Sequence, residues 1–255
     1  MQKDNIMSAW SHPPAALSLE PQHVDIWRAR LEFPNESLKM WEATLSTDEA
    51  ERAARFHFPA DRDRFVASHG FLRGILARYL HSEPGELTFS VNQYGKPALN
   101  DHKLEFNLSH SRDFALVAVA QKRKVGVDVE RIRQGISSQS IARQYFSKSE
   151  VAELQILSLE QREVAFFTCW TRKEAYIKAQ GLGLSLPLES FDVSLTPNEP
   201  AILRATRPDP EDAARWTLLS LDVDSHYGSA VAVEGQGLEF RLWDWNLEIH
   251  ETSVD

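Results

Sequence analysis

Residues 121–132 read QKRKVGVDVERI, a basic turn followed by a segment with the alternation of a β-strand. Ahead of this stretch, an amphipathic helix expected over 61–81 is followed by three short strands. After it, a helix expected over 159–180 is followed by five more. Because each half runs from helices to antiparallel strands, the sequence predicts an α+β protein of two pseudo-symmetric lobes, each a small antiparallel sheet packed with helices. The expected layout is a flexible extension over 1–22, an N-terminal lobe over 23–122, a C-terminal lobe over 123–245 carrying the chemistry, and a tail over 246–255.

The composition of the 255-residue chain is that of a globular protein, with 42% hydrophobic and 25% charged residues. No apolar run reaches the roughly 18 residues that a membrane-spanning helix needs. The N-terminus lacks the apolar core of a secretory signal. The single cysteine, Cys169, excludes an internal disulfide framework and a CxxC metal site. We therefore expect a cytoplasmic protein that does not enter a membrane.

The charge of the chain is unevenly distributed. A net charge of −9 argues against a general nucleic-acid binder. Residues 51–80, however, hold six arginines against three acidic residues, a local charge of +3. Such a cluster favours a small polyanion as ligand. The alternative is a solvated helix face of Asp–Arg pairs.

The segment VGVDVER, residues 125–131, places its valines on one face of a strand and Gly126, Asp128 and Glu130 on the other. Two carboxylates on one face raise each other's pKa unless a cation lies between them. A hard divalent cation such as Mg²⁺, which prefers oxygen ligands, would serve. The alternative is an exposed strand face that is polar because water covers it.

The segment TCWTRKEAYIKAQGLG, residues 168–183, places Trp170, Glu174 and Lys178 on one side of a helix, with Lys173 at its edge. A Glu–Lys pair at this spacing is common on helix surfaces, but a large aromatic in the same row is less expected there. Glu174 is a candidate third carboxylate for the cation, and the lysines are candidates for phosphate oxygens. This division of labour is typical of phosphoryl transfer.

Three further segments carry polar groups. FNLSHS offers Ser109 and His110 at a strand end, where they could hydrogen-bond phosphate or base edges, and YGKPAL presents Lys96 in a turn. The alternative for both segments is an ordinary turn, with His110 as a surface group. Glu150 either completes a capping box with Ser147 or acts as a base near the metal. The sequence lacks the GxxxxGK[ST], GxGxxG and HExxH motifs.

Together these segments resemble the 4′-phosphopantetheinyl transferases of the long, surfactin-synthetase type. The family pattern G-[VI]-D-x-E stands here at 126–130, and W-[ST]-x-K-E-A-x-x-K at 170–178. NLSHS, YGKP and RFHFPADRDR also resemble family segments, in the same order. The resemblance covers roughly residues 22–243.

The resemblance implies an α+β fold of two pseudo-symmetric lobes in a monomer. It implies transfer of the 4′-phosphopantetheine arm of coenzyme A to a serine of an apo acyl or peptidyl carrier protein, with release of adenosine 3′,5′-bisphosphate. The carrier is expected near the lobe junction, with Leu182 and Leu184 as candidate contacts. By matching position, the resemblance assigns Asp128, Glu130 and Glu174 as ligands of Mg²⁺, with Mn²⁺ as the alternative. It assigns Lys173 and Lys178 to stabilise the charge on the leaving bisphosphate, and Glu150 to accept the proton of the carrier serine. The residues it assigns to coenzyme A binding are Arg52, Arg64, Lys96, Ser109, His110, Lys173 and Lys178.

Two rival functions remain on the sequence alone. One is a non-catalytic module that binds coenzyme A or another nucleotide, for which the carboxylates would be dispensable. The other is a metal-dependent phosphohydrolase, which would use similar acids with water as the nucleophile.

Overall fold

The computed structural model describes residues 6–7, 9–100, 104–133, 138–197 and 199–245, without the side chains of 6, 7 and 184. The helices are α1 (Asn35–Glu42), α2 (Thr47–Ala54), α3 (Pro59–Leu80), α4 (Ser138–Tyr145), α5 (Lys148–Ile156) and α6 (Leu159–Gln180). The strands are β1 (Ile6–Met7), β2 (His23–Arg30), β3 (Phe89–Val91), β4 (Pro97–Leu99), β5 (Leu104–Ser111), β6 (Phe114–Gln121), β7 (Val125–Arg131), β8 (Phe191–Val193), β9 (Leu203–Thr206), β10 (Trp216–Leu221), β11 (Tyr227–Glu234) and β12 (Glu239–Asp244).

Two four-stranded sheets form the centre of the protein. The first has the strand order β12-β2-β6-β5, and the second has the order β1-β10-β11-β7. Hairpins β3-β4 and β8-β9 complete the fold. The mixture of helices and small, mostly antiparallel sheets confirms the predicted α+β class.

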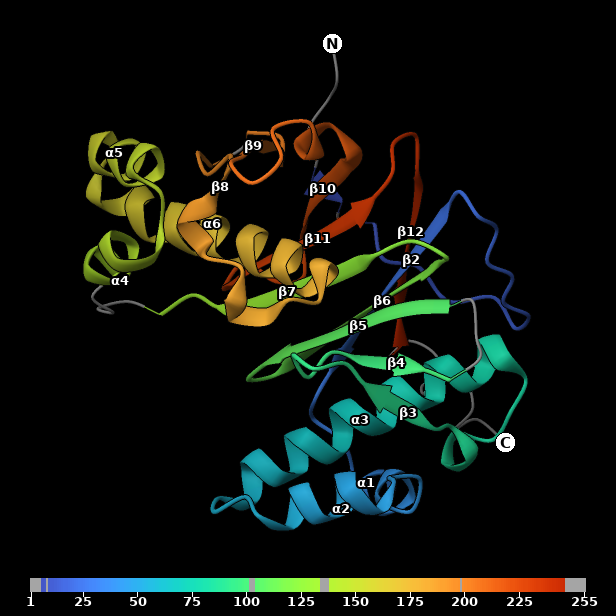
Figure 1. The fold of residues 1–255 in the computed structure, drawn as a ribbon. Helices are drawn as coiled ribbons and strands as arrows, with labels where there is room; N and C mark the ends of the chain where they lie inside the picture. Colours follow the sequence, from blue (N-terminus) through green and yellow to red (C-terminus); the bar gives the residue numbers. More distant parts are fainter. Residues whose placement is uncertain (1–5, 8, 101–103, 134–137, 198, 246–255) are drawn as a thin grey trace.

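The two sheets pack against each other, and one long helix covers the outer side of each. Valines of β7 and β11 share a core with Val24, Ile26 and Leu116 of the first sheet. On the far side of the first sheet, α3 packs Phe71 and Ile75 against Trp27 and the strands around it. Figure 1 shows α3 and α6 on opposite sides of the strands.

Helix α6 lies directly on β7 because Gly126 has no side chain. A Cβ at Gly126 would come within 3.0 Å of the Ala175 carbonyl and the Ala179 amide. The helix begins after Ser158, whose hydroxyl accepts from the amide of Gln161, and ends at Gly181 in the left-handed region (φ 69°). The Gly126–Asp128–Glu130 face of β7 is therefore the one that meets α6.

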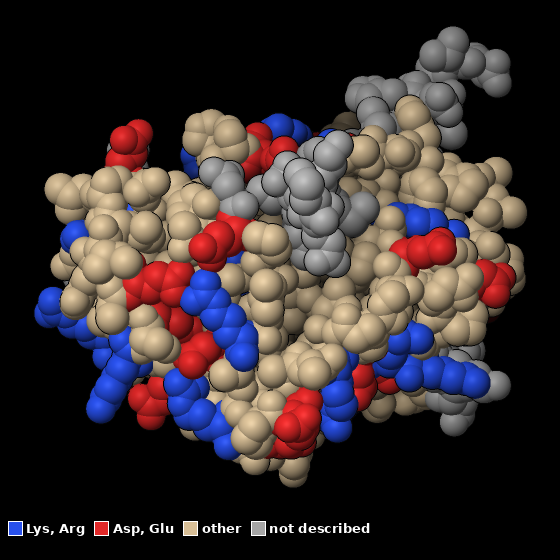
Figure 2. Space-filling view, turned by 90° about the horizontal axis from the view of Figure 1, so that it is seen from above, with Lys and Arg blue, Asp and Glu red and all other residues tan. Residues whose placement is uncertain are grey.

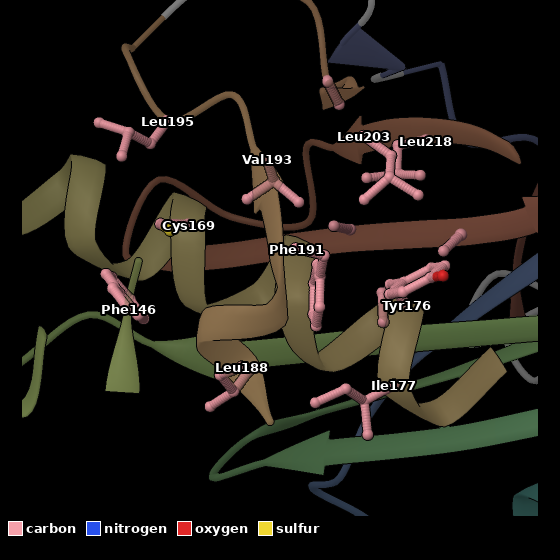
Figure 3. Packing of buried hydrophobic residues seen from close by; sticks show 14 of the residues in the cluster. Phe146, Cys169, Tyr176, Ile177, Leu188, Phe191, Val193, Leu195, Leu203 and Leu218 are labelled. Atoms are coloured by element: carbon pink, nitrogen blue, oxygen red, sulfur yellow. The ribbon is translucent and has the colours of Figure 1, made fainter. Parts of the chain in front are cut away.

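The second lobe has an aromatic core between α6 and the β8 region. Phe191 and Tyr176 lie close together there, with ring centres 4.8 Å apart (Figure 3). The Tyr176 hydroxyl donates to Asp212 Oδ2 over 2.6 Å. This core holds α6 in place on the side opposite Trp170, Glu174 and Lys178.

The terminal strands differ from the predicted layout. The β12 strand, expected in the second lobe, pairs in parallel with β2 of the first sheet. The β1 strand, within the extension expected to be flexible, pairs in parallel with β10 of the second sheet. The extension is also held by Trp10, whose indole N–H donates to Asp222 O over 2.6 Å, and by buried Leu19. The lobes therefore exchange their terminal strands, and each sheet contains one parallel pair.

The expected tail over 246–255 lies outside the described residues. No helix in the described part of the chain combines the length and apolar character that crossing a membrane requires.

Candidate active site

A cleft of about 970 Å³ runs between the two lobes. Its first-lobe side comes from α2, α3 and the β3-β4 hairpin, and its second-lobe side comes from β7 and α6. Trp170, Glu174 and Lys178 all line it, as their shared helix side predicts, and so do Asp128 and Glu130. The two sequence segments that suggested phosphoryl transfer thus meet in one place.

Asp128 is buried at the floor of this cleft, with 3% of its surface exposed. Its Oδ1 accepts from Lys178 Nζ over 2.6 Å and from Ser109 Oγ over 2.9 Å. Its Oδ2 is also buried but has no hydrogen-bond partner among the described residues. A buried carboxylate oxygen without a donor is costly, so Oδ2 is available to a cation.

Glu130 and Glu174 contribute negative charge to the same cleft. Burial raises the pKa of Glu130, and repulsion from Asp128 raises it further, while a hydrogen bond from Ser111 lowers it. Burial and the charge of Asp128 likewise raise the pKa of Glu174. Among the described residues that line the cleft, these three carboxylates share the region with one ammonium, that of Lys178, which favours an additional cation.

The acids are nevertheless not arranged as a finished metal centre. Among the residues that the structure describes, no three His, Cys, Asp or Glu side chains form a group ready to hold a metal ion. Instead, Lys178 contacts Asp128 Oδ1. A divalent cation would fit the charge and the free Oδ2, but its binding would require side-chain adjustment.

Cationic groups gather around His110 in the same cleft. Reduced hydration lowers the pKa of His110, and the positive charges of Lys178, Arg52 and Arg64 lower it further. Arg52 lines the cleft, with its guanidinium 5.3 Å from the ring centre of Phe65. These groups are placed to attract an anion.

Most of the arginine cluster, Arg64 included, follows the alternative of paired charges. Arg64 pairs with Asp61 over 3.0 Å, Arg62 pairs with Glu42 and Asp63, and Arg73 is buried against Glu49. Figure 2 views the molecule from the side of α5, β9 and β10, away from this cluster, and basic and acidic side chains are interspersed on that face as well. The local excess of positive charge in the sequence is therefore largely neutralised in the fold.

The position of Lys96 differs from the expectation that it binds a phosphate. Its Nζ donates to Val125 O over 3.1 Å and to Ala179 O over 3.2 Å. Burial lowers the pKa of this ammonium. Carbonyls near the end of α6 attract it because that end carries partial negative charge. Lys96 thus connects the β3-β4 hairpin to the second lobe and does not line the cleft.

Glu150 and Lys173 also lie away from the cleft, and we revise both expected roles. They form a fully buried ion pair, with Nζ 2.8 Å from Oε2. Lys173 also donates to two carbonyls, while Glu150 accepts from the amides of Ser147 and Val193, each over 2.9 Å. Of the two roles left open for Glu150, the structure shows the helix cap. Lys173 points away because it is displaced from Glu174 by about 100° around the helix.

Ser109 lines the cleft, but its hydroxyl is already hydrogen-bonded within the protein. Its Oγ accepts from the amide of Val129 and from Lys178 Nζ, and donates to Asp128. It is 6% exposed. In this structure Ser109 therefore supports Asp128, and its expected contact with coenzyme A stays a prediction.

His69 is a cleft residue that the sequence reading missed. Its ring stacks on Phe65, with centres 3.8 Å apart, and its Nδ1 lies 3.0 Å from Phe65 O. Burial lowers its pKa to about 4. The signal was its position four residues after Phe65, which places both rings on one helix side.

Comparisons with known proteins cover both lobes. Residues 33–122 match the family model "4′-phosphopantetheinyl transferase, N-terminal", and residues 124–232 match the 4′-phosphopantetheinyl transferase superfamily. The 4′-phosphopantetheinyl transferase HetI of Nostoc sp. (strain PCC 7120) is 41% identical over 244 residues, which are 94% of this chain and 100% of HetI. This chain belongs to the 4′-phosphopantetheinyl transferase superfamily.

Two further relatives extend the comparison. A putative 4′-phosphopantetheinyl transferase of Synechocystis sp., slr0495, is 32% identical to this transferase over 74% of the chain and 76% of its own length. The 4′-phosphopantetheinyl transferase Sfp of Bacillus subtilis (strain 168) is 32% identical over 59% of the chain and 66% of its own length. The family named from sequence motifs is thus confirmed.

Proposed function

We propose that this transferase moves the 4′-phosphopantetheine arm of coenzyme A onto a serine of an apo acyl or peptidyl carrier protein. The serine oxygen would form a bond to the phosphorus next to the arm, and the bond from that phosphorus to adenosine 3′,5′-bisphosphate would break. The proton of the serine hydroxyl would be released to solvent. One observation carries the proposal: a single cleft joins three carboxylates and Lys178 to a cationic end around His110. Such a cleft is suited to a pyrophosphate with a charged nucleotide at one end.

Asp128, Glu130 and Glu174 are the residues proposed to hold Mg²⁺, with Mn²⁺ as the alternative. The unpartnered Oδ2 of Asp128 and the raised pKa values of both glutamates support this assignment. When bound, the metal would neutralise charge on the pyrophosphate oxygens.

Lys178 is proposed to stabilise the charge that develops on the leaving bisphosphate. It already reaches the floor of the cleft, where it contacts Asp128 and Ser109. A cation that relieved Asp128 of its charge would release this ammonium for a phosphate oxygen. Arg52, Arg64 and His110 are proposed to bind the nucleotide phosphates. Arg52 and His110 line the cleft. Arg64 does not line it and is paired with Asp61, but its positive charge acts on His110.

The carrier surface remains a prediction. Leu182 is half-buried in the turn after α6, whereas the Leu184 side chain lies outside the described part of the chain. Cytoplasmic location and a monomeric state are likewise proposals, supported by the sequence and the family.

In the direct test, the transferase is incubated with coenzyme A, Mg²⁺ and an apo carrier, and the intact mass of the carrier is then measured by mass spectrometry. The proposal predicts that the intact mass rises by the mass of the arm and that adenosine 3′,5′-bisphosphate is released. A constant carrier mass across several carriers would contradict it. Release of the bisphosphate without a carrier would favour the phosphohydrolase, and binding of coenzyme A without turnover would favour the binding module.

A further inference from the structure

The lobes meet along an unusual junction between β5 and β7, which are edge strands of different sheets. In place of a backbone ladder, side chains of β5 accept the amide protons of β7. The contributing side chains alternate along β5, as residues on one face of a strand do. The three bonds are Val127 N to Asn107 Oδ1 (2.9 Å), Val129 N to Ser109 Oγ (3.3 Å) and Arg131 N to Ser111 Oγ (3.2 Å).

The two serines of this junction also contact the proposed metal ligands. Ser109 Oγ donates to Asp128 Oδ1 over 2.9 Å, and Ser111 Oγ donates to Glu130 Oε2 over 2.8 Å. A serine hydroxyl has one proton, and its lone pairs here accept N–H groups. The direction of each bond is therefore fixed, with the proton on the carboxylate side.

Each serine occupies one oxygen of its carboxylate and leaves the other. Asp128 Oδ2 is buried without a hydrogen-bond partner among the described residues, and the Ser111 hydroxyl holds Oε2 of Glu130 and not its Oε1. We infer that Ser109 and Ser111 are positioning residues that present one oxygen each of Asp128 and Glu130 to a divalent cation, and thereby favour Mg²⁺ over Ca²⁺. This inference rests on the proposed metal-binding role of these two acids.

The coordination preferences of the two cations give the physical reason. Mg²⁺ takes six oxygens in a strict octahedron and binds through one or two carboxylates, with water and phosphate in its other positions. Ca²⁺ takes six to eight oxygens and accepts both oxygens of one carboxylate. A hydroxyl that already holds Glu130 Oε2 opposes such two-oxygen binding, so it penalises Ca²⁺ more than Mg²⁺.

Ser111 provides the cleaner test because, unlike Ser109, it does not contact Lys178. The full-length protein is titrated with Mn²⁺, and free Mn²⁺ is measured by electron paramagnetic resonance. Mg²⁺ and Ca²⁺ are then used as competitors. We expect Ser111→Ala to weaken Mg²⁺ binding by about 10- to 100-fold, the usual cost of losing a group that orients a metal ligand. Ca²⁺ binding should weaken less, so the Mg²⁺/Ca²⁺ preference falls.

Two variants control for packing. Ser111→Thr keeps the hydroxyl and should keep the parent preference. Ser229→Ala removes a comparably buried strand serine whose hydroxyl donates to Leu221 O and to neither carboxylate, so its metal affinity should equal the parent's. If Ser111→Ala does not fold, Ser111→Cys replaces the hydroxyl by a weak donor and should shift the preference in the same direction.

The outcomes separate this inference from the proposed function. If the parent and Asp128→Ala bind Mn²⁺ equally, or neither binds it, the metal site itself is wrong. If the parent binds Mn²⁺, Asp128→Ala does not, and folded Ser111→Ala keeps both the parent affinity and the parent Mg²⁺/Ca²⁺ preference, the metal site stands and the positioning role of Ser111 is refuted.

Discussion

Lys178 contacts the buried carboxylate of Asp128 and lies on the same helix as a second carboxylate of the cleft, that of Glu174. Its ammonium lies 2.6 Å from Asp128, and Glu174 lies one helical turn before it. This arrangement keeps charges of both signs at the floor of the cleft before any ligand arrives. The chemistry proposed here therefore depends on individual charges more than on the size of the cleft.

Replacing Asp128 or Glu174 by alanine should remove most of the transferase activity. Each change deletes a proposed metal ligand, and removal of one electrostatic contact of this kind costs about 10²- to 10³-fold in rate. The rise in carrier mass with time measures the effect. Glu160→Ala, which changes an exposed acid in the first turn of the same helix, should match the parent. Parent-like rates for either cleft variant would show that the metal assignment is wrong.

His69 should make stability depend on pH below neutrality. Its pKa is about 4 in the folded protein against an ordinary value of 6.5, so the unfolded chain binds the proton first as the pH falls. Stability is therefore unaffected above pH 6.5 and decreases between pH 6.5 and 4, by about 1.4 kcal/mol per pH unit. Urea unfolding at several pH values should show a shallower decrease for His69→Phe. Equal slopes for parent and variant would contradict the lowered pKa.

At the scale of elements, the position of α6 on β7 sets the geometry of the site. The absence of a side chain at Gly126 allows the helix backbone to approach the strand that carries Asp128 and Glu130. On its opposite side, the helix is held by the buried pair of Lys173 and Glu150. Both contacts can be tested separately from the chemistry.

Gly126→Ala should force α6 away from β7. The added methyl group meets main-chain atoms that cannot move alone, and overpacking of this kind costs about 1–3 kcal/mol. Denaturant unfolding measures the loss, and the transfer rate should fall as well because Glu174 and Lys178 move with the helix. Gly85→Ala is the control, since the nearest atom to its new Cβ lies 3.9 Å away. Equal stability of the two variants would contradict the close approach.

Lys173→Met should destabilise the protein by about 3–5 kcal/mol, because it leaves the charge of Glu150 buried without its partner. Adding Glu150→Gln should restore part of that loss. Glu150→Gln alone should keep a near-parent rate per folded molecule. A loss of about 10²- to 10⁴-fold in a stably folded Glu150→Gln protein would instead identify a general base.

The sequence was sufficient for features that depend on local periodicity. Alternation placed Asp128 and Glu130 on one strand face, and helical spacing aligned Glu174 with Lys178. It failed for Lys96 and Lys173, because their partners are backbone carbonyls and a carboxylate brought close only by the packing of distant elements. Lys173 was assigned to phosphate from its charge and Lys96 from the family resemblance, although in the fold each is buried against oxygen atoms of the protein.

At the scale of the whole molecule, the ends of the chain hold the opposite lobes. The β12 strand completes the first sheet, and β1 completes the second. Strand periodicity could not reveal this exchange, since it shows which segments form strands but not which strands pair. The exchange therefore alters one part of the predicted layout, the assignment of residues 23–122 to one lobe and residues 123–245 to the other.

Arg241→Ala tests the contribution of this exchange. Arg241 of β12 donates to both oxygens of the buried Asp25 in β2, over 2.6 and 2.8 Å. Removing Arg241 leaves the buried carboxylate of Asp25 without this counter-charge. Because Arg241 is partly exposed, we expect the free energy of unfolding to fall by about 3 kcal/mol, near the lower end of the range for broken buried pairs. Thermal and urea unfolding measure it. The double variant with Asp25→Asn should recover part of the loss, and a neutral single variant would show that the pair does not hold β12.

The exchange of terminal strands has a consequence for biosynthesis. Asp25 and Arg241 are 216 residues apart in sequence, so the first sheet cannot gain its edge strand until residue 244 has been translated. Domains otherwise tend to fold in order as they leave the ribosome. For this protein, the first lobe cannot reach its final form on a nascent chain that stops at the junction, because its sheet also needs β12 from the far side of the second lobe.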